Sequence, residues 1–208
     1  MYDHIGGGFH RYSTDPEWQI PHFEKMLYDQ AILSRTYLEA YQITHDDFYA
    51  RVAVEIFDYV LRDMQFAEGG FYSAEDADSL DPDQYFGMTF DPAQAHEKKE
   101  GSFYLWRYDE IVNILGRDEA EIFNYHFGIN PQGNAHQDPH GEFIGKNIIF
   151  VENTIEETAK HFQKGVSEVQ ESLRHSKNKL FEVRKTRPRP HLDDKILADW
   201  NGLMISSL

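Results

Sequence analysis

The stretch PHFEKMLYDQAILSRTYLEAYQ, Pro21–Gln42, has the spacing that decides the fold class. Its apolar residues recur every three or four positions, as on one face of a helix, and proline suits the first helical position. These apolar residues are Phe23, Met26, Leu27, Leu33, Tyr37 and Tyr41. The pattern therefore predicts one long helix over residues 21–42.

A second helix is predicted directly after the first. His45 and Asp46 supply its cap, and an apolar stripe runs from Phe48 to Met64 and stops before a pair of glycines. Two helices with such a short connection pack antiparallel as an αα-hairpin. We expect this hairpin to be the unit from which the fold is built.

The rest of the chain adds more helices and only short strands. Short strands are predicted at 71–73, 102–106 and 147–151, and a polar insertion over 80–101 is expected on the surface. Further helices are predicted at 108–115, 118–127, 154–161 and 166–184, and from 193–194 to the last residue. Because strands and helices do not alternate, the sequence predicts a mainly α fold with small β-hairpin insertions.

Composition limits the class of partner. The 208 residues, 40% of them hydrophobic, can bury a core, and 36 acidic residues against 20 basic ones give a net charge of −16. Such a charge repels phosphate backbones and anionic membranes, so we expect neither nucleic acid nor a membrane as partner. The absence of cysteine agrees with a reducing compartment, and no signal segment or membrane span is visible. A cytoplasmic location is therefore expected.

An acidic segment, EGGFYSAEDADS at residues 68–79, is the first candidate for chemistry. On a strand, Asp76 and Asp78 would project from one face with Cα atoms about 6.6 Å apart. Two carboxylates at that range can titrate at different pH, as glycoside hydrolysis requires, although the spacing does not distinguish retention from inversion. The alternative is an acidic turn whose oxygens accept backbone N–H bonds. A calcium loop fits less well, because the glycine and distal glutamate of an EF-hand are missing.

Three residues near the first predicted helix are further candidates. His22 would occupy the second helical position, where the helix dipole disfavours imidazolium, so a neutral imidazole could act as a general base. The alternative is a histidine that packs against Phe23 and Met26. His10 and Arg11 follow three glycines and could hold sugar hydroxyls or a carboxylate. Their alternative is a simple glycine turn.

The segment HLDDKILADWNG, residues 191–202, contains the last candidates. Either Asp193 or Asp194 can cap the final helix, which leaves the other acid for binding. Trp200 and Asn201 follow one to two turns later, and an indole face beside an amide can grip a sugar ring. The alternative for Trp200 is a place in the core.

No cofactor or metal site is predicted. His136 and His140 stand four apart, but Pro139 and Gly141 argue against the helix that would join them on one metal. The three glycines at 6–8 lack the spacing and the preceding strand of a dinucleotide fingerprint.

Several motifs, taken in order, resemble the YyaL-type, or spermatogenesis-associated protein 20-like, family. They are GGGFHRYSTDPEWQIPHFEKMLYDQA, GGFYSAEDADS, SFYLW, GKNI and RPRPHLDDKILADWNGLMISSL. The resemblance implies a thioredoxin-like domain followed by a six-hairpin (α/α)6 toroid, the architecture also of N-acylglucosamine 2-epimerase and several glycosidases. The chain has no thioredoxin-like segment and room for only about half of the toroid's helices. We therefore expect residues 1–208 to form one partial toroid domain, truncated at both ends.

The resemblance and the acidic pair together suggest a carbohydrate-active domain that acts on or binds a small sugar, as a glycoside hydrolase or a sugar epimerase. Its predicted catalytic residues are Asp76, Asp78 and His22, and its predicted substrate-binding residues are His10, Arg11, Asp193, Asp194, Trp200 and Asn201. The alternative is a non-catalytic sugar-binding or scaffolding domain of a thioredoxin-domain-containing protein, inactive as a fragment. Inner helices without their toroid partners would expose apolar surface and favour self-association.

Overall fold

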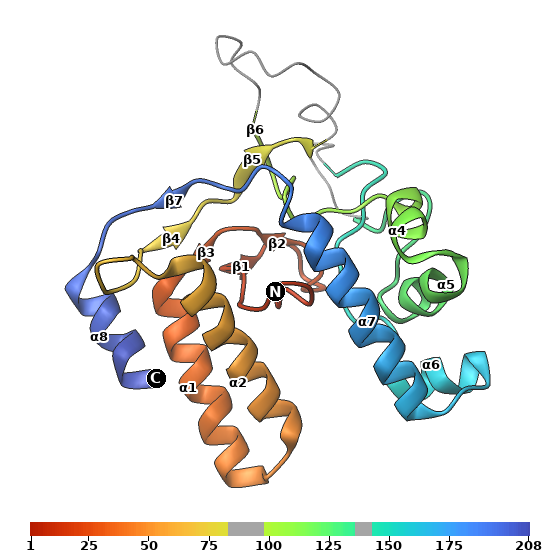
Figure 1. Ribbon diagram of the computed structural model, residues 1–208, viewed down its shortest axis with the longest axis horizontal. Coiled ribbons are helices and arrows are strands. Elements are labelled where there is room, and N and C mark those ends of the chain that lie inside the picture. Colours follow the sequence, from red (N-terminus) through yellow and green to blue (C-terminus); the bar gives the residue numbers. More distant parts are fainter. Residues whose placement is uncertain (83–97, 136–142) are drawn as a thin grey trace.

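The computed structural model describes residues 1–82, 98–135 and 143–208 (Figure 1). These residues form seven α-helices and short strands, which confirms the mainly α prediction. The helices are α1 (Leu27–Thr44), α2 (Asp47–Tyr59), α4 (Tyr108–Leu115), α5 (Arg117–His126), α6 (Ile155–Phe162), α7 (Val166–Arg184) and α8 (Ala198–Ser207). One π-helical turn, η1 (Val60–Met64), follows α2 directly.

The predicted αα-hairpin is confirmed, but its first helix begins later than expected. Helix α1 starts at Leu27, because residues 21–26 pair as strands β2 (Pro21–His22) and β3 (Lys25–Met26). A short apolar run does not distinguish a buried strand from a helix, which explains the error. Helix α2 starts as predicted, with the Asp46 carboxylate accepting a hydrogen bond from the Phe48 N–H.

Short antiparallel strands join the helices. They are β1 (Tyr12–Ser13), paired with β2; β4 (Ala74–Glu75), between β3 and β7 (Leu192–Asp193); and β5 (Asp78–Leu80), paired with β6 (Lys98–Glu100). The strand predicted at 71–73 is displaced to β4, and residues 102–106 form mostly a turn that ends in a bridge to Asn147. Most of the predicted insertion at 80–101 lies outside the described residues.

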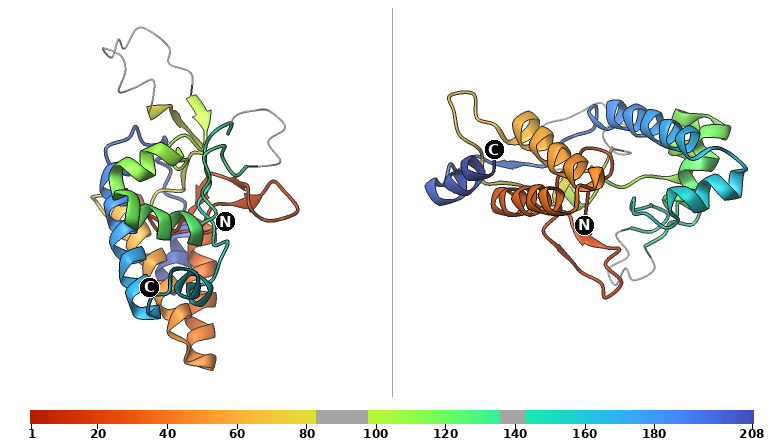
Figure 2. Two further views of the ribbon diagram at one scale, coloured as in Figure 1. Left: turned by 90° about the vertical axis from the view of Figure 1, so that its right-hand side faces the viewer. Right: turned by 90° about the horizontal axis from the view of Figure 1, so that it is seen from below.

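Two groups of helices lie side by side (Figures 1 and 2). Helices α1, α2 and α8 share one core, in which Leu27, Ile56 and Met204 are fully buried. Helices α4–α7 share another, around Trp106, Phe123 and Leu180. The N-terminal loop and the strands connect the groups, with β3, β4 and β7 along one edge in Figure 1. No helix in the described ranges is long and apolar enough to cross a membrane.

Candidate functional site

The two predicted catalytic acids do not share a strand. Strand β4 ends at Glu75 and β5 begins at Asp78, so the prediction of one continuous strand is wrong. The chain turns between two sheets here, and the Asp76 carboxylate accepts a hydrogen bond from the Ala77 N–H, 2.8 Å away. The acids still interact, because burial first, and then the charges of Asp76 and Glu100, raise the pKa of Asp78.

His22 lies in β2 rather than in a helix, so the helix-dipole argument for its neutrality does not apply. Its Nδ1 is 2.7 Å from the Glu100 carboxylate, and the Tyr12 ring stacks on it with centroids 4.9 Å apart. Glu100 is also the register partner of Asp78 in the β5–β6 ribbon. The structure therefore brings His22 and Asp78 together around Glu100.

His10 and Arg11 have different surroundings. His10 is buried, its Nδ1 lies 2.9 Å from the Phe23 carbonyl oxygen, and its ring packs edge-to-face on Tyr104. Burial first, and then the charge of Lys25, lowers the pKa of His10, so its imidazole is neutral. Arg11 instead projects outward and donates to Glu24 at 2.9 Å.

The predicted binding residues near α8 have structural contacts. The predicted cap is wrong, because α8 begins only at Ala198 and Asp193 lies in β7, paired with Lys195 at 2.8 Å. Asp194 is exposed. Asn201 clamps one backbone position through its side-chain amide, which accepts from the Phe71 N–H at 2.7 Å and donates to the Phe71 carbonyl at 3.0 Å.

Trp200 follows the alternative that the sequence left open. It is half-buried against the core of α1, α2 and α8, with its ring edge-to-face on Tyr28 at 4.8 Å. These contacts are made within the helical core, and neither of them involves His22, Asp78 or Glu100.

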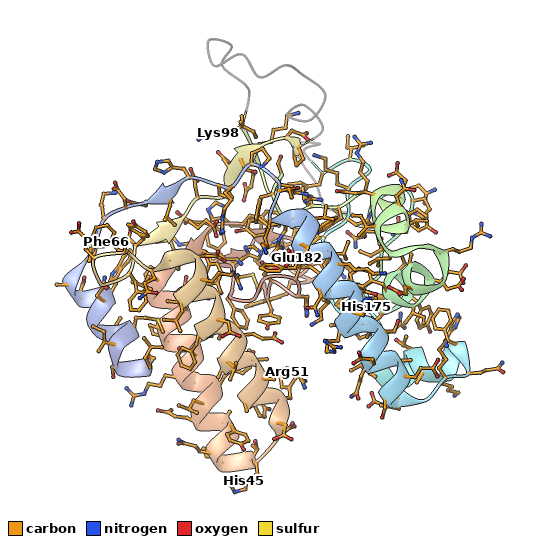
Figure 3. All side chains as sticks on the ribbon, in the orientation of Figure 1. His45, Arg51, Phe66, Lys98, His175 and Glu182 are labelled. Carbon is orange, nitrogen blue, oxygen red and sulfur yellow. The ribbon has the colours of Figure 1, made fainter. Side chains whose placement is uncertain are left out.

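A cleft between α2 and α7 contains a larger concentration of charged groups. Three neighbouring cavities share lining residues along it: two share Arg62 and Phe181, and the next pair shares Glu55 and Lys177. Their volumes are about 250, 260 and 670 Å³. In Figure 3, Arg51 projects from α2 toward α7. We call this feature the α2–α7 cleft.

The cavity of about 250 Å³, at the end of the cleft nearest β3 and β4, has an unusual number of buried ionic side chains, and we call it the polar cavity. Its lining residues are Asp3, Lys25, Tyr59, Arg62, Asp63, Glu75, Phe103, Tyr104, Phe181, Arg184, Lys185 and Arg189. The π-helical turn η1 contributes Arg62 and Asp63. Single π-helical turns frequently occur at functional sites. The polar cavity is therefore a stronger candidate for a functional site than the group of His22, Asp78 and Glu100.

Glu75 is one centre of the polar cavity. It is 2% exposed, and its Oε2 accepts hydrogen bonds from the hydroxyls of Tyr59 at 2.9 Å and Tyr104 at 3.2 Å. Its Oε1 accepts from the Arg189 guanidinium at 2.7 Å. Burial and the charge of Glu75 raise the pKa of both tyrosines, so they remain protonated donors at neutral pH.

Lys25 is the other centre, and it projects from the same face because it is the register partner of Glu75. It is 1% exposed and its Nζ donates to Asp3 and to the Gly7 carbonyl, both at 2.8 Å. The Tyr59 ring centroid lies 4.2 Å from the same Nζ. Burial lowers the pKa of Lys25, and the charge of Asp3 opposes that shift, so this ammonium gives up its proton more readily than an exposed lysine.

Sequence reasoning missed Lys25, Glu75 and the arginines of this cavity. One signal was visible, because Lys25 lies beside Glu24 between the apolar residues Phe23 and Met26, and a buried lysine needs a partner. Its partner Asp3 also binds Arg184, 181 positions further along the chain, and only the fold reveals this group.

The described ranges contain no group of three or more histidine or carboxylate side chains placed to hold a metal ion. His136 and His140 lie outside the described residues.

Comparison with known proteins identifies relatives over nearly the whole chain. This chain is 45% identical to spermatogenesis-associated protein 20 of Homo sapiens over 215 residues, which cover 98% of this chain and 26% of the human protein. The Mus musculus protein of the same name is 45% identical over 217 residues, and Uncharacterized protein B0495.5 of Caenorhabditis elegans is 39% identical over 219 residues. The chain spans about a quarter of the length of these relatives. No known family description matches it.

Proposed function

We propose that this chain, a homologue of about a quarter of spermatogenesis-associated protein 20, is part of a carbohydrate-active domain that binds a small sugar in the polar cavity. The proposal includes the architecture: the α1–α2 hairpin and the helices α4–α7 are part of an (α/α)6 toroid. The relatives' names state no substrate, so the proposal depends on the chemistry of the cavity.

One observation carries the proposal: aromatic rings and buried hydrogen-bonding groups line the same small space. The rings of Phe103 and Tyr104 lie edge-to-face at 5.0 Å beside the Lys25 ammonium and the Glu75 carboxylate. Sugars bind where an aromatic ring covers their C–H face and fixed polar groups bond their hydroxyls. A volume of about 250 Å³ lies just below the range of roughly 300–1,000 Å³ typical of ligand pockets and suits a small molecule.

The residues present supply groups for either reaction. A sugar epimerase needs proton carriers, and Lys25, whose pKa burial lowers, is one inside the cavity. A hydrolase needs one carboxyl held protonated beside an ionised one, and Asp78, whose pKa is raised, has Asp76 and Glu100 as neighbours. Asp76, Asp78 and His22 remain the proposed acid and base groups for hydrolysis, at a position outside the lining of the polar cavity.

The test is sugar binding and turnover by the purified chain. Titration calorimetry with a panel of monosaccharides and disaccharides should detect binding, and Glu75→Gln should weaken it at least tenfold, because the charge that orients both tyrosine hydroxyls is lost. Glu121→Gln, a matched change at an exposed position on α5, should leave affinity unchanged. Equal binding by the wild type and Glu75→Gln would remove the polar cavity from the proposal.

A second candidate function is sugar binding or scaffolding without catalysis. It is favoured by Glu75 and Asp3, since both oxygens of each carboxylate already accept hydrogen bonds from the protein. Analysis of the sugars after incubation separates the two functions. Unchanged sugars, with an affinity that Asp76→Asn and Asp78→Asn do not alter, would establish the non-catalytic one.

We also propose self-association through the exposed apolar side chains of α8 and α1. Leu203, Ile205 and Leu208 at the chain's last helix are 43%, 66% and 58% exposed, and Ile32 on α1 is 53% exposed. Sedimentation velocity should show a concentration-dependent dimer, whereas one monomeric species at every concentration would contradict this.

A further inference from the structure

The α2–α7 cleft reverses the charge of the protein around it. Among the described residues, eight lysine and arginine side chains line its three cavities, against five carboxylates. The whole chain has the opposite balance, with 20 basic and 36 acidic residues. A cleft with excess positive charge between low-dielectric walls concentrates anions, even in a protein of net negative charge.

In the polar cavity, five cations face three carboxylates. Two of the five, Lys25 and Arg184, are buried and bound to Asp3. The other three form a rim that solvent reaches: the side chains of Arg62, Lys185 and Arg189 are 36%, 51% and 44% exposed. The rim cations are therefore the ones that an incoming ligand would meet.

Each rim cation already has an acidic partner. Asp63 accepts hydrogen bonds from both Arg62 and Arg189, and Glu75 accepts a further one from Arg189. Lys185 pairs with the exposed Glu182, and exposed pairs of this kind hold a cation only weakly. Lys185 is therefore the rim cation most readily available to an incoming anion, in a cavity whose lining has two more cations than carboxylates.

An aromatic side chain sets the spacing of two rim cations. The Arg62 guanidinium carbon lies 4.8 Å and the Lys185 ammonium 5.4 Å from the centroid of the Phe181 ring. Cation–π contacts of this length favour both positions, so the same ring holds both charges at the wall of the cavity that Phe181 lines. A phosphate or carboxylate group that enters the cavity can pair with either cation, while Tyr59 and Tyr104 line the space available to the rest of the molecule.

We infer that the polar cavity selects sugars that carry an anionic group, a phosphate or a carboxylate, over neutral sugars. This inference rests on the proposed function for the sugar ring and on the rim cations for the charge. Sugar phosphates and uronic acids share this chemistry, and the experiment separates them.

The experiment is titration calorimetry of the purified chain with four probes: glucose, glucose 6-phosphate, glucuronate and inorganic phosphate. At least one charged sugar should bind about tenfold or more tightly than glucose, and more tightly than inorganic phosphate. Raising the salt from about 0.05 M to about 0.3 M should weaken binding of the charged sugar and leave glucose unaffected.

Variants assign the effect to the rim. Lys185→Gln should weaken the charged sugar on the order of three- to tenfold without changing the affinity for glucose. Arg117→Gln, which removes one exposed cation from the start of α5, should change neither. Because Lys185 lies at the exposed end of α7, its loss should leave the fold intact, which the unchanged binding of glucose verifies.

The outcomes separate the two proposals. Equal affinity for glucose and both charged sugars would overturn the anionic selection and leave sugar binding standing. Equal affinity for glucose 6-phosphate and inorganic phosphate would support the anion site and contradict the sugar function. Binding of none of the four probes would overturn the anionic selection.

Discussion

Replacement of Asp3 by asparagine should destabilise the protein more than any exposed charge substitution. Asp3 is 6% exposed, and its oxygens accept hydrogen bonds from Lys25 and from both terminal nitrogens of Arg184, at 2.8–2.9 Å. Its Oδ1 also accepts from the N–H groups of Ile5 and Gly6 at 3.0 Å. Asparagine can keep these backbone bonds, so the substitution removes mainly the charge that two buried cations need.

The magnitude follows from the burial of the partners. Lys25 and Arg184 are 1% and 4% exposed, and removal of one partner from a buried ion pair costs about 3–5 kcal/mol. We expect a loss of this size for Asp3→Asn, a large share of the roughly 5–15 kcal/mol that stabilises a typical domain. Lys25→Met should cost less, because Asp3 and Arg184 then still balance one another.

Urea unfolding followed by circular dichroism gives both free energies, with Asp194→Asn as the exposed control, expected to lie within about 0.5 kcal/mol of the wild type. Burial raises the pKa of Asp3, but Arg184 and Lys25 outweigh it and hold that pKa well below its usual value. The stabilisation is therefore complete above about pH 4 and disappears only as the pH falls further. A loss below about 1 kcal/mol for Asp3→Asn at pH 7, or a larger loss for Lys25→Met, would refute the charge balance.

Two further predictions concern pH and packing. Burial lowers the pKa of His126 to about 4, so the stability that its neutral form contributes should be full above about pH 6.5 and fall by up to about 1.4 kcal/mol per pH unit toward pH 4. In denaturant unfolding, His126→Gln should make the loss of stability over this range less steep by that amount, because the buried His4 and His10 still contribute, while exposed His45→Gln should not change it. Gly101 and Gly116 both have positive φ, but a Cβ at Gly101 would lie 2.6 Å from the Phe23 ring and one at Gly116 would meet nothing within 4 Å. Gly101→Ala should therefore lower the free energy of unfolding by about 1–3 kcal/mol more than Gly116→Ala, and equal losses would show that backbone strain alone matters.

Much of the helical framework could be predicted, because its start and stop signals are local. The helix predicted at 108–115 coincides with α4, and the one at 166–184 with α7. The N-terminal end of α1 could not, because Lys25 and Met26 gain their hydrogen bonds from β4, a partner almost 50 positions away. Apolar spacing contains no information on such distant pairing.

The site was missed for a related reason. Neighbouring residues on an extended chain point to opposite faces, so Glu75 and Asp76 have different surroundings although they adjoin. The visible cluster of acids drew attention to Asp76 and Asp78, whereas the buried face contains Glu75 and its partner Lys25. Inside the cavity Glu75 pairs with Arg189, more than 100 positions later, and no local pattern reports such a pairing.

The ions that line the polar cavity also connect the two groups of helices. Asp3 in the N-terminal loop binds Lys25 ahead of α1 and Arg184 at the end of α7, so its loss would disturb the fold and the cavity together. If a variant of Asp3 bound a ligand more weakly, the cause could be either the loss of a contact with the ligand or a displacement of α7. Rim residues are different, because Lys185 is half-exposed and its ion-pair partner is the exposed Glu182. Binding chemistry must therefore be tested at the rim, and stability at Asp3.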